Sequence, residues 1–226
     1  LRLRVPVSYG APHLGLGVAS INLGSEDALP PAPGNAALPP GFTLNQQVLQ
    51  QLLRGNTALG TPALETLSLT ARDVINVYGS VELDTRDPAT GRSSLDTLVL
   101  GAPAIHGYGS AQDRARIFAD SLIWDGTLGA GTVLGDATTQ PIAAPIAGQP
   151  GSGQLDILAG TIALARPPLA RQSSEASAHR QVLGFSALNL TASESVSFAG
   201  KGSLDVHQQR GEYLAGSGWQ DSGGQL

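Results

Sequence analysis

The sequence predicts an all-β fold, namely a right-handed parallel β-helix (a solenoid) with one short flanking helix and long loop insertions. Two observations favour this fold: a short apolar phrase recurs along the chain, and the composition suits tight turns between strands. Of the 226 residues, 29 are Gly and 15 are Pro, and only 14% are charged, against about 25% in an ordinary soluble domain. Low charge suits coils stacked about 4.8 Å apart, because identical charges on successive coils would repel. We expect a single β-helical segment over residues 1–226.

The recurring phrase has two apolar residues two positions apart, then Ala two positions on, then an aliphatic residue three or four positions later. The alternation is typical of a strand with one buried face, and the step after Ala predicts a bend between two short strands. Its copies are Leu67-Leu69-Ala71 with Val74 or Ile75, Leu98-Leu100-Ala102-Ile105, the shorter Ile117-Ala119-Leu122, Leu155-Ile157-Ala159-Ile162 and Leu188-Leu190-Ala192-Val196.

The spacing of the copies separates the possible β architectures. The middle apolar residue falls at positions 69, 100, 117, 157 and 190, so the intervals are 31, 17, 40 and 33 residues. A sandwich or barrel would usually give hairpin signals every 8–12 residues, and only residues 84–94 resemble a hairpin loop. Irregular intervals favour a parallel β-helix, whose coils allow loops of any length to leave between them.

Four segments do not follow the phrase. Residues 29–42 carry five prolines and predict a loop. Residues 43–55 predict a short flanking helix, because Thr43 and Gln46 have the spacing of a capping box and Gly55 suits a C-cap. Residues 129–153 and 171–180 are predicted loop insertions. The apolar stripe of the helix is Leu44, Val48, Leu49, Leu52 and Leu53.

Charge and composition exclude several classes of function. The net charge is −5, and no basic face is available to neutralise the phosphates of a nucleic acid. The absence of Cys excludes a disulfide framework, a Cys-based zinc site and a thiol nucleophile. No apolar run approaches the roughly 18 residues of a membrane span. The chain starts at Leu1 without a signal segment, so we expect it to be part of a longer protein.

Three aromatic residues form the candidate binding surface: Tyr78, Tyr108 and Trp124. Tyr78 and Tyr108 each precede a Gly at the turn after a copy of the phrase. Stacked on adjacent coils, they would make an exposed aromatic strip for glycans or protein partners. The alternative is that they only cover the turn glycines, and that Trp124 packs on the neighbouring coil.

Catalytic and metal sites are expected to be absent. Asp120 and Asp125 flank Trp124, as two carboxylates flank a sugar in a glycosidase, but a strand end followed by a turn explains them better. His106 follows Ile105 at a strand end, where we expect an exposed turn residue rather than a metal ligand. No close ligand spacing links the four histidines, which are His13, His106, His179 and His207.

No nucleophile or phosphate-binding motif is complete. Ser186 lacks the second Gly of a nucleophile elbow, and residues 200–203 lack the spacing of a phosphate-binding loop. No cofactor is expected.

Four segments, in this order, resemble large exoproteins of Gram-negative bacteria related to filamentous haemagglutinin. They are PPGFTLNQQVLQQLLRG, LETLSLTARDVINVYGSVELDT, LVLGAPAIHGYGS and LGFSALNLTASESVSFAGKGSL. The resemblance runs from about Pro39 to Leu226 and is strongest to a distal conserved region without an assigned activity.

The resemblance implies a β-helical rod exported by two-partner secretion through an outer-membrane transporter and displayed at the cell surface. Such proteins are adhesins, or stalks that carry contact-dependent toxins, so the expected partner is a receptor or glycan of a host or neighbouring cell. The absence of Cys suits a chain that crosses the periplasm unfolded. The amino-terminal secretion module with its Asn-Pro-Asn turns and any toxin module are missing from this sequence. The alternative is a polysaccharide-degrading parallel β-helix enzyme.

Overall fold

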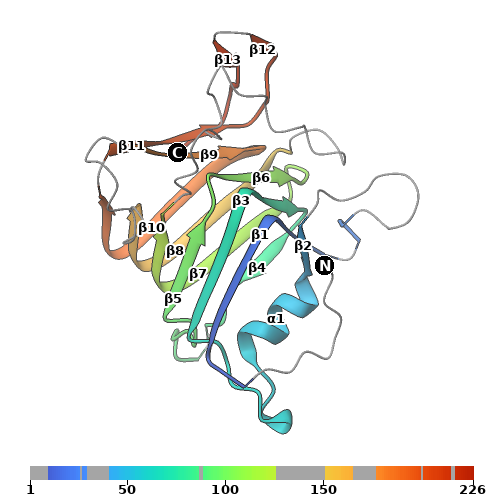
Figure 1. Ribbon diagram of the computed structural model, residues 1–226, viewed down its shortest axis with the longest axis vertical. Helices are drawn as coiled ribbons and strands as arrows, with labels where there is room; N and C mark the ends of the chain where they lie inside the picture. The colour runs from blue at the N-terminus through green and yellow to red at the C-terminus, as the bar shows by residue number, and fades with distance from the viewer. Residues whose placement is uncertain are drawn as a thin grey trace.

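The computed structural model describes residues 10–25, 27–29, 41–86, 89–125, 151–164, 177–199, 201–214 and 217–226. This part of the chain is mostly β with one short helix, as the sequence predicts. Eleven strands form one large sheet, and every strand pair in it is parallel. The sheet curves through 273° into a nearly closed barrel (Figure 1).

The sheet combines five long strands of 11–14 residues with six short strands of 3–7 residues. The sheet contains β1 (His13–Gly24), β2 (Phe42–Asn45), β3 (Thr66–Tyr78), β4 (Val81–Leu83), β5 (Thr97–Gly101), β6 (Ala104–Tyr108), β7 (Arg114–Trp124), β8 (Gly153–Leu164), β9 (Ser177–Leu183), β10 (Phe185–Phe198) and β11 (Lys201–His207). Outside it lie α1 (Gln46–Arg54), the 3-10 turn η1 (Thr57–Leu59) and the antiparallel pair β12 (Tyr213–Leu214) and β13 (Gly218–Trp219).

Parallel pairing arranges the strands of the described residues in three ladders. Ladder A stacks residues 13–18, 66–71, 97–101, 121–124, 161–164 and 195–198. Ladder B stacks residues 42–45, 20–24, 74–78, 104–108, 177–183 and 201–207. Ladder C stacks residues 81–83, 114–119, 153–159 and 185–192, and Gln225 hydrogen-bonds to the outer side of its last rung.

The ladders explain the irregular intervals of the apolar phrase. Two copies lie at the bend from ladder A to ladder B, where Leu67 pairs with Leu98. The other three lie at the bend from ladder C to ladder A, where Ala159 pairs with both Ala119 and Ala192. The short interval of 17 residues is therefore the step from one bend to the next within a single turn of the chain.

A sixth copy lies in β1 and has Val18 in the place of Ala. Leu14 and Leu16 pair with Leu67 and Leu69, and the register shifts between Val18 and Ser20. A register shift marks a β-bulge, which bends a strand. The bend predicted after the third apolar position of the phrase is therefore also present in the first strand.

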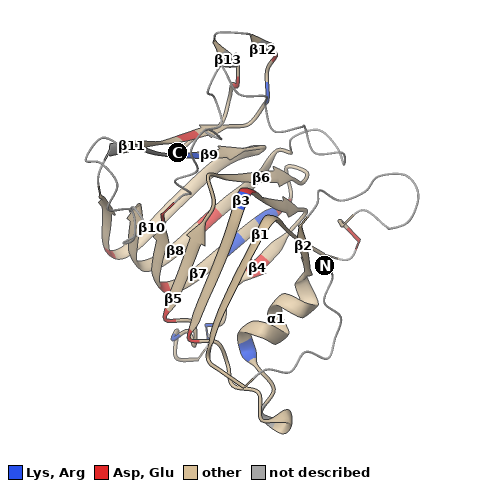
Figure 2. Ribbon diagram, in the orientation of Figure 1, with Lys and Arg blue, Asp and Glu red and all other residues tan. Residues whose placement is uncertain are grey.

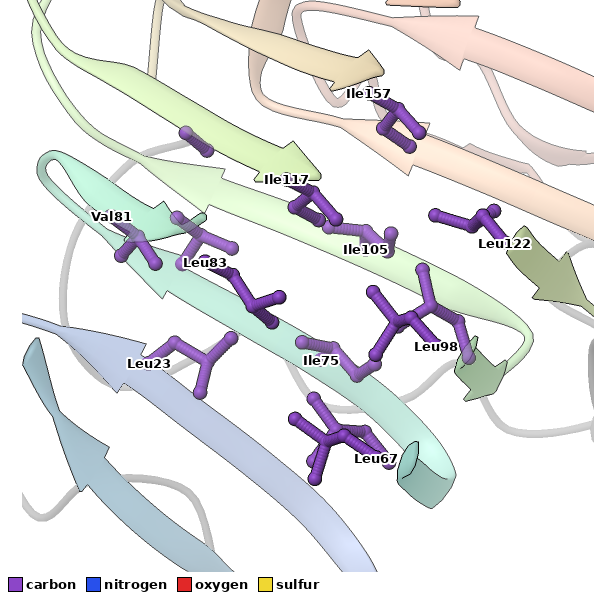
Figure 3. Packing of buried hydrophobic residues seen from close by; sticks show 14 of the residues in the cluster. Leu23, Leu67, Ile75, Val81, Leu83, Leu98, Ile105, Ile117, Leu122 and Ile157 are labelled. Atoms are coloured by element: carbon purple, nitrogen blue, oxygen red, sulfur yellow. The ribbon is translucent and has the colours of Figure 1, made fainter. Parts of the chain in front are cut away.

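One hydrophobic core runs between the ladders. Its side chains come from alternate positions of successive rungs, such as Leu67, Leu98 and Leu122 in ladder A, all of which are buried. Figure 3 shows these side chains interleaved between the strands. Charged residues are sparse over the sheet and stand mostly as single positions (Figure 2). No helix in the described ranges is long and apolar enough to cross a membrane.

Helix α1 is present, but it begins later than the sequence pattern predicts. The predicted N-cap, Thr43, lies in β2 and pairs with Asn22. Asn45 caps the helix instead, because its Oδ1 accepts a hydrogen bond of 2.8 Å from the backbone N–H of Val48. At the other end Gly55 has a φ of 67°, and its N–H donates to the carbonyl of Gln51, so the predicted C-cap is confirmed.

The helix closes one end of ladder C. The side chain of Gln46 donates to the backbone carbonyl of Glu82 at 2.7 Å and accepts from its N–H at 3.0 Å, and Gln50 donates to the same carbonyl at 2.9 Å. These bonds replace those that a neighbouring strand would make with β4. The buried face of α1, formed by Val48, Leu49, Leu52 and Leu53, joins the core.

All three predicted loops overlap a strand at their last residues. Residues 30–40, 126–150 and 171–176 lie outside the described residues, but Phe42 already belongs to β2 and Gly153 to β8. Residues 177–180, predicted as loop, are strand: Arg180 in β9 pairs with Leu204 and donates from Nε to the carbonyl of Trp124 at 2.7 Å. Strand β9 was not predicted because residues 177–180 are mostly polar and show no apolar alternation. Its pairing partners, residues 104–106 and 201–207, are separate segments of the sequence.

Candidate functional site

Tyr78 and Tyr108 stack on each other at the ends of β3 and β6. Their ring centroids are 4.9 Å apart and their planes meet at 22°, because the two residues are partners in ladder B. The expected stacking is confirmed. The expected exposure is wrong for Tyr78, which is 2% exposed, whereas Tyr108 is half-buried.

A turn of the chain covers Tyr78. Leu29 is buried beside the end of β3, and a Cβ added to Gly79 would meet the Cβ of Ala28 at 2.8 Å. Burial raises the pKa of the Tyr78 hydroxyl to about 12. The pKa of the Tyr108 hydroxyl is also raised, mainly by burial and to a smaller extent by the neighbouring Tyr78. The tyrosine pair therefore stays neutral and serves mainly to pack this end of ladder B.

Trp124 belongs to the core, so its predicted place on an exposed surface is wrong. Its side chain is 0% exposed, and its indole N–H donates to the carbonyl of Ala102 at 2.8 Å. The alternation Leu122-x-Trp124 places the indole on the inner face of ladder A, where Trp124 pairs with Leu100. Trp124 therefore stabilises the stack and is not available to a ligand.

Asp120 and Asp125 are not brought together. Asp120 lies at the bend into ladder A, and Asp125 follows the last residue of the same rung. Five residues of extended chain separate their α-carbons by about 16 Å, whereas the carboxyl groups of a glycosidase lie roughly 5–9.5 Å apart. Burial raises the pKa of Asp125 to about 6, against the opposing effect of the Arg180 guanidinium.

His106 is buried, so the exposed turn position expected for it is wrong. It continues a polar column on the outer side of ladder B, where the amide of Asn76 donates to Asn22 Oδ1 at 2.9 Å. Burial, and then the charge of Arg210, lower the pKa of His106 to about 3, so the ring is neutral. No three His, Asp or Glu side chains in the described ranges are grouped as ligands for a metal ion.

The surface carries a groove at the bend from ladder C to ladder A. Its cavity volume is about 410 Å³, within the range of roughly 300–1,000 Å³ that ligand pockets occupy. It crosses β7, β8 and β10, and each of these strands contributes both an outward side chain of ladder C and a residue of the bend. The lining residues are Phe118, Asp120, Leu158, Ala159, Gly160, Thr191, Ser193 and Glu194.

An acidic column borders the groove, and we name it by its members Glu65, Asp96, Asp120 and Glu194. Each of these residues precedes the first paired residue of a ladder A rung, and all four are exposed. Gly160 takes the same position between Asp120 and Glu194. Burial, and then the charges of Asp96 and Glu194, raise the pKa of Asp120. The column is an exception to the expectation that like charges are absent from successive coils.

Sequence reasoning identified Asp120 but missed Glu194 and Phe118. A usable signal is nevertheless present, because an acid followed by Thr or Ser precedes four of the rungs of ladder A. The copies are Glu65-Thr66, Asp96-Thr97, Asp120-Ser121 and Glu194-Ser195, with Gly160-Thr161 as the fifth. The hydroxyls of Ser121 and Thr161 lie 3.2 Å apart, so this second repeat marks one face of the stack.

The groove combines carboxylates and hydroxyls with an apolar end. Thr191, Ser193, Asp120 and Glu194 offer donors and acceptors for a polyhydroxylated ligand. The guanidinium of Arg86 lies 4.2 Å from the centroid of the Phe118 ring and covers one face of it. The ring therefore gives the groove an apolar wall, but this face is not open to stacking with a ligand. Comparisons of the chain with protein-family models, with curated proteins and with solved structures find no match.

Proposed function

We propose that the chain is a right-handed parallel β-helical segment of a secreted bacterial surface exoprotein, similar to filamentous haemagglutinin, with a structural and adhesive role and no catalysis. The stacking of the apolar phrase carries this proposal. The chain passes through ladders A, B and C in order, as at residues 66–71, 74–78 and 81–83, and then repeats the order at residues 97–101, 104–108 and 114–119. A solenoid with three faces would require this succession, so the order of the rungs supports the proposal.

An adhesive role is supported by the surface that the stack presents. Stacked rungs place outward side chains in rows about 4.8 Å apart, and such rows suit a long partner better than a small one. The groove at the bend from ladder C to ladder A offers hydroxyls and carboxylates to a glycan or protein receptor of a host or neighbouring cell. Export would use an outer-membrane two-partner secretion transporter, with the segment displayed at the cell surface of a Gram-negative bacterium.

Engineered disulfides test the stacked fold, since the chain has no Cys of its own. Ser121 and Thr161 are partners in ladder A, so the S121C/T161C pair should oxidise readily, and the oxidised chain should migrate faster on denaturing electrophoresis without reductant than with it. The S121C/A163C pair is two residues out of register, which is too far for an unstrained bridge, and serves as the control. Equal oxidation of the two pairs contradicts the proposed register.

Cell binding tests the adhesive role. The labelled chain should be retained on bacterial or epithelial cells in a saturable manner, above an unrelated β-helix used as a control. Replacing Thr191 and Glu194 by Ala should lower retention at least fivefold, whereas replacing Asn189, outside the groove on the same strand, should leave it unchanged. Retention equal to the unrelated control would contradict adhesion and leave the chain a structural segment.

A second candidate function, polysaccharide cleavage, has one specific observation in its favour. Asp120 and Glu194 lie two rungs apart across Gly160, which places their α-carbons about 9.6 Å from each other, near the roughly 6.5–9.5 Å between the carboxyl groups of inverting glycosidases. If this function holds, reducing ends appear from a polysaccharide panel, and D120N or E194Q abolishes them while D96N does not. Activity that survives both substitutions would contradict this assignment.

A further inference from the structure

Ladder A ends in an apolar edge at β10. Val196 and Phe198 are 44% and 69% exposed, whereas their partners one rung earlier, Ile162 and Leu164, are 0% and 2% exposed. Within the described ranges no strand pairs with the outer edge of β10 beyond Ser195. The two apolar positions of the rung are therefore filled as in every earlier rung, but no strand of the described residues covers them.

The opposite end of ladder A is also an open edge. Residues 13–18 of β1 pair with β3, and in the described part of the chain no other strand pairs with them. Leu14 and Leu16 are only partly buried against the core. They pair with Leu67 and Leu69, so they hold the same two ladder positions as Val196 and Phe198.

We propose that a second copy of the chain docks on this edge, with its β1 added in parallel beside β10. In this arrangement Leu14 of the second copy covers Val196, and Leu16 covers Phe198. Backbone hydrogen bonds between the two edges would give affinity, and the alternating apolar positions would fix the register. Every pair in the sheet is parallel, so the added rung continues the ladder without a change of direction.

The charges at the two edges are compatible with this contact. The acidic column reaches the β10 edge at Glu194. On β1 the corresponding position is Pro12, whose carbonyl accepts from the N–H of Glu65, and His13 follows it. Glu194 would therefore face an uncharged residue beside an imidazole, and docking would not lengthen the column of like charges.

The contact leaves room for both copies. A Cβ added to Gly15 or Gly17 would meet no atom within 4 Å, so the outer face of the sheet is open at these positions, and no described strand other than β3 pairs with residues 13–18. Ladders A and B each contain six rungs there, and ladder C ends at α1. The contact is therefore confined to ladders A and B, and because the two edges differ it propagates as an open line of copies.

Sedimentation of the whole chain over a concentration series tests the proposal. The weight-average mass of the wild type should rise above the 23.0 kDa of one copy as concentration increases. F198D should stay near one copy, with an association constant at least tenfold weaker, because a carboxylate would be buried at the contact. L59D is the matched control, since Leu59 is 54% exposed but lies in η1, and it should associate as the wild type does.

A complementation experiment identifies the second edge. L16D blocks β1 and F198D blocks β10, so each alone should be monomeric, and an equimolar mixture should stop at two copies. If L16D does not fold, as judged by circular dichroism, F198D and L59D still decide the question. The proposal rests on the parallel stack, and the S121C/T161C disulfide tests that stack separately.

Three results would overturn the proposal. The first is a wild type that stays at 23.0 kDa at every concentration. The second is an F198D variant that associates as the wild type does. The third is a monomeric wild type that binds a peptide of residues 153–164 at its β10 edge, because the edge would then accept a strand other than β1. If one of these results is obtained and the S121C/T161C disulfide still forms, the association of two copies is rejected and the parallel stack is retained.

Discussion

The Tyr78 hydroxyl is buried and, among the described residues, has no hydrogen-bond partner. A buried polar group without a partner carries its desolvation cost uncompensated. We therefore expect Y78F to leave the free energy of unfolding unchanged or to raise it by about 1 kcal/mol. Y78A, which also removes the stacked ring, should lower it by about 3 kcal/mol or more. Urea unfolding measures both, and a Y78F loss as large as that of Y78A would show that the hydroxyl is bonded.

Asp125 gives the fold a defined pH dependence. Its pKa is raised from 3.8 to about 6 by burial, so the folded state holds this proton more tightly than the unfolded state does. Between pH 4 and pH 6 the contribution of Asp125 to stability therefore falls as pH rises. D125N should flatten the free energy of unfolding over this range, as measured by urea unfolding at several pH values. A D125N variant with the wild-type slope would contradict burial of Asp125 as the cause.

Helix α1 stabilises the stack through the hydrogen bonds of Gln46 and Gln50 to Glu82 as well as through its apolar face. Q46A removes both hydrogen bonds between the Gln46 side chain and the backbone of Glu82, and should lower the free energy of unfolding by about 1–2 kcal/mol. Q47A is the matched control, because Gln47 is exposed on the same turn and should change it by less than about 0.5 kcal/mol. Thermal unfolding compares the two, and equal effects would show that only helix propensity matters.

At the scale of elements, the sequence allowed the strands, the bends and the helix to be predicted, but not the assignment of strands to ladders. The phrase has the same local pattern at both bends, and only the pairing of distant residues distinguishes them. Strand β9 was missed because Ser177, His179 and Arg180 are polar. The start of the helix was missed because Thr43 and Asn45 both suit an N-cap. The burial of Trp124 was predictable from its alternation with Leu122, whereas the groove depended on three strands meeting at one bend.

At the scale of the whole molecule, stability should fall from the centre of the stack towards its open end. Ile162 lies between Leu122 and Val196 in ladder A and is 0% exposed, whereas Val196 forms the open edge. I162A should lower the free energy of unfolding by about 2–5 kcal/mol. At low concentration V196A should cost less than about 1 kcal/mol, because partly exposed atoms lose little burial. Urea unfolding of both variants measures this gradient.

The cost of V196A should also depend on protein concentration. If a second copy covers the β10 edge, Val196 becomes buried there, and its truncation then removes contacts as a core substitution does. Association adds to the apparent stability by mass action, so V196A should become more destabilising relative to wild type as concentration rises, whereas the cost of I162A should stay constant. Hydrogen exchange of residues 195–206 at two concentrations reports the same change at the backbone. A concentration-independent cost for V196A would mean that no second copy covers the β10 edge.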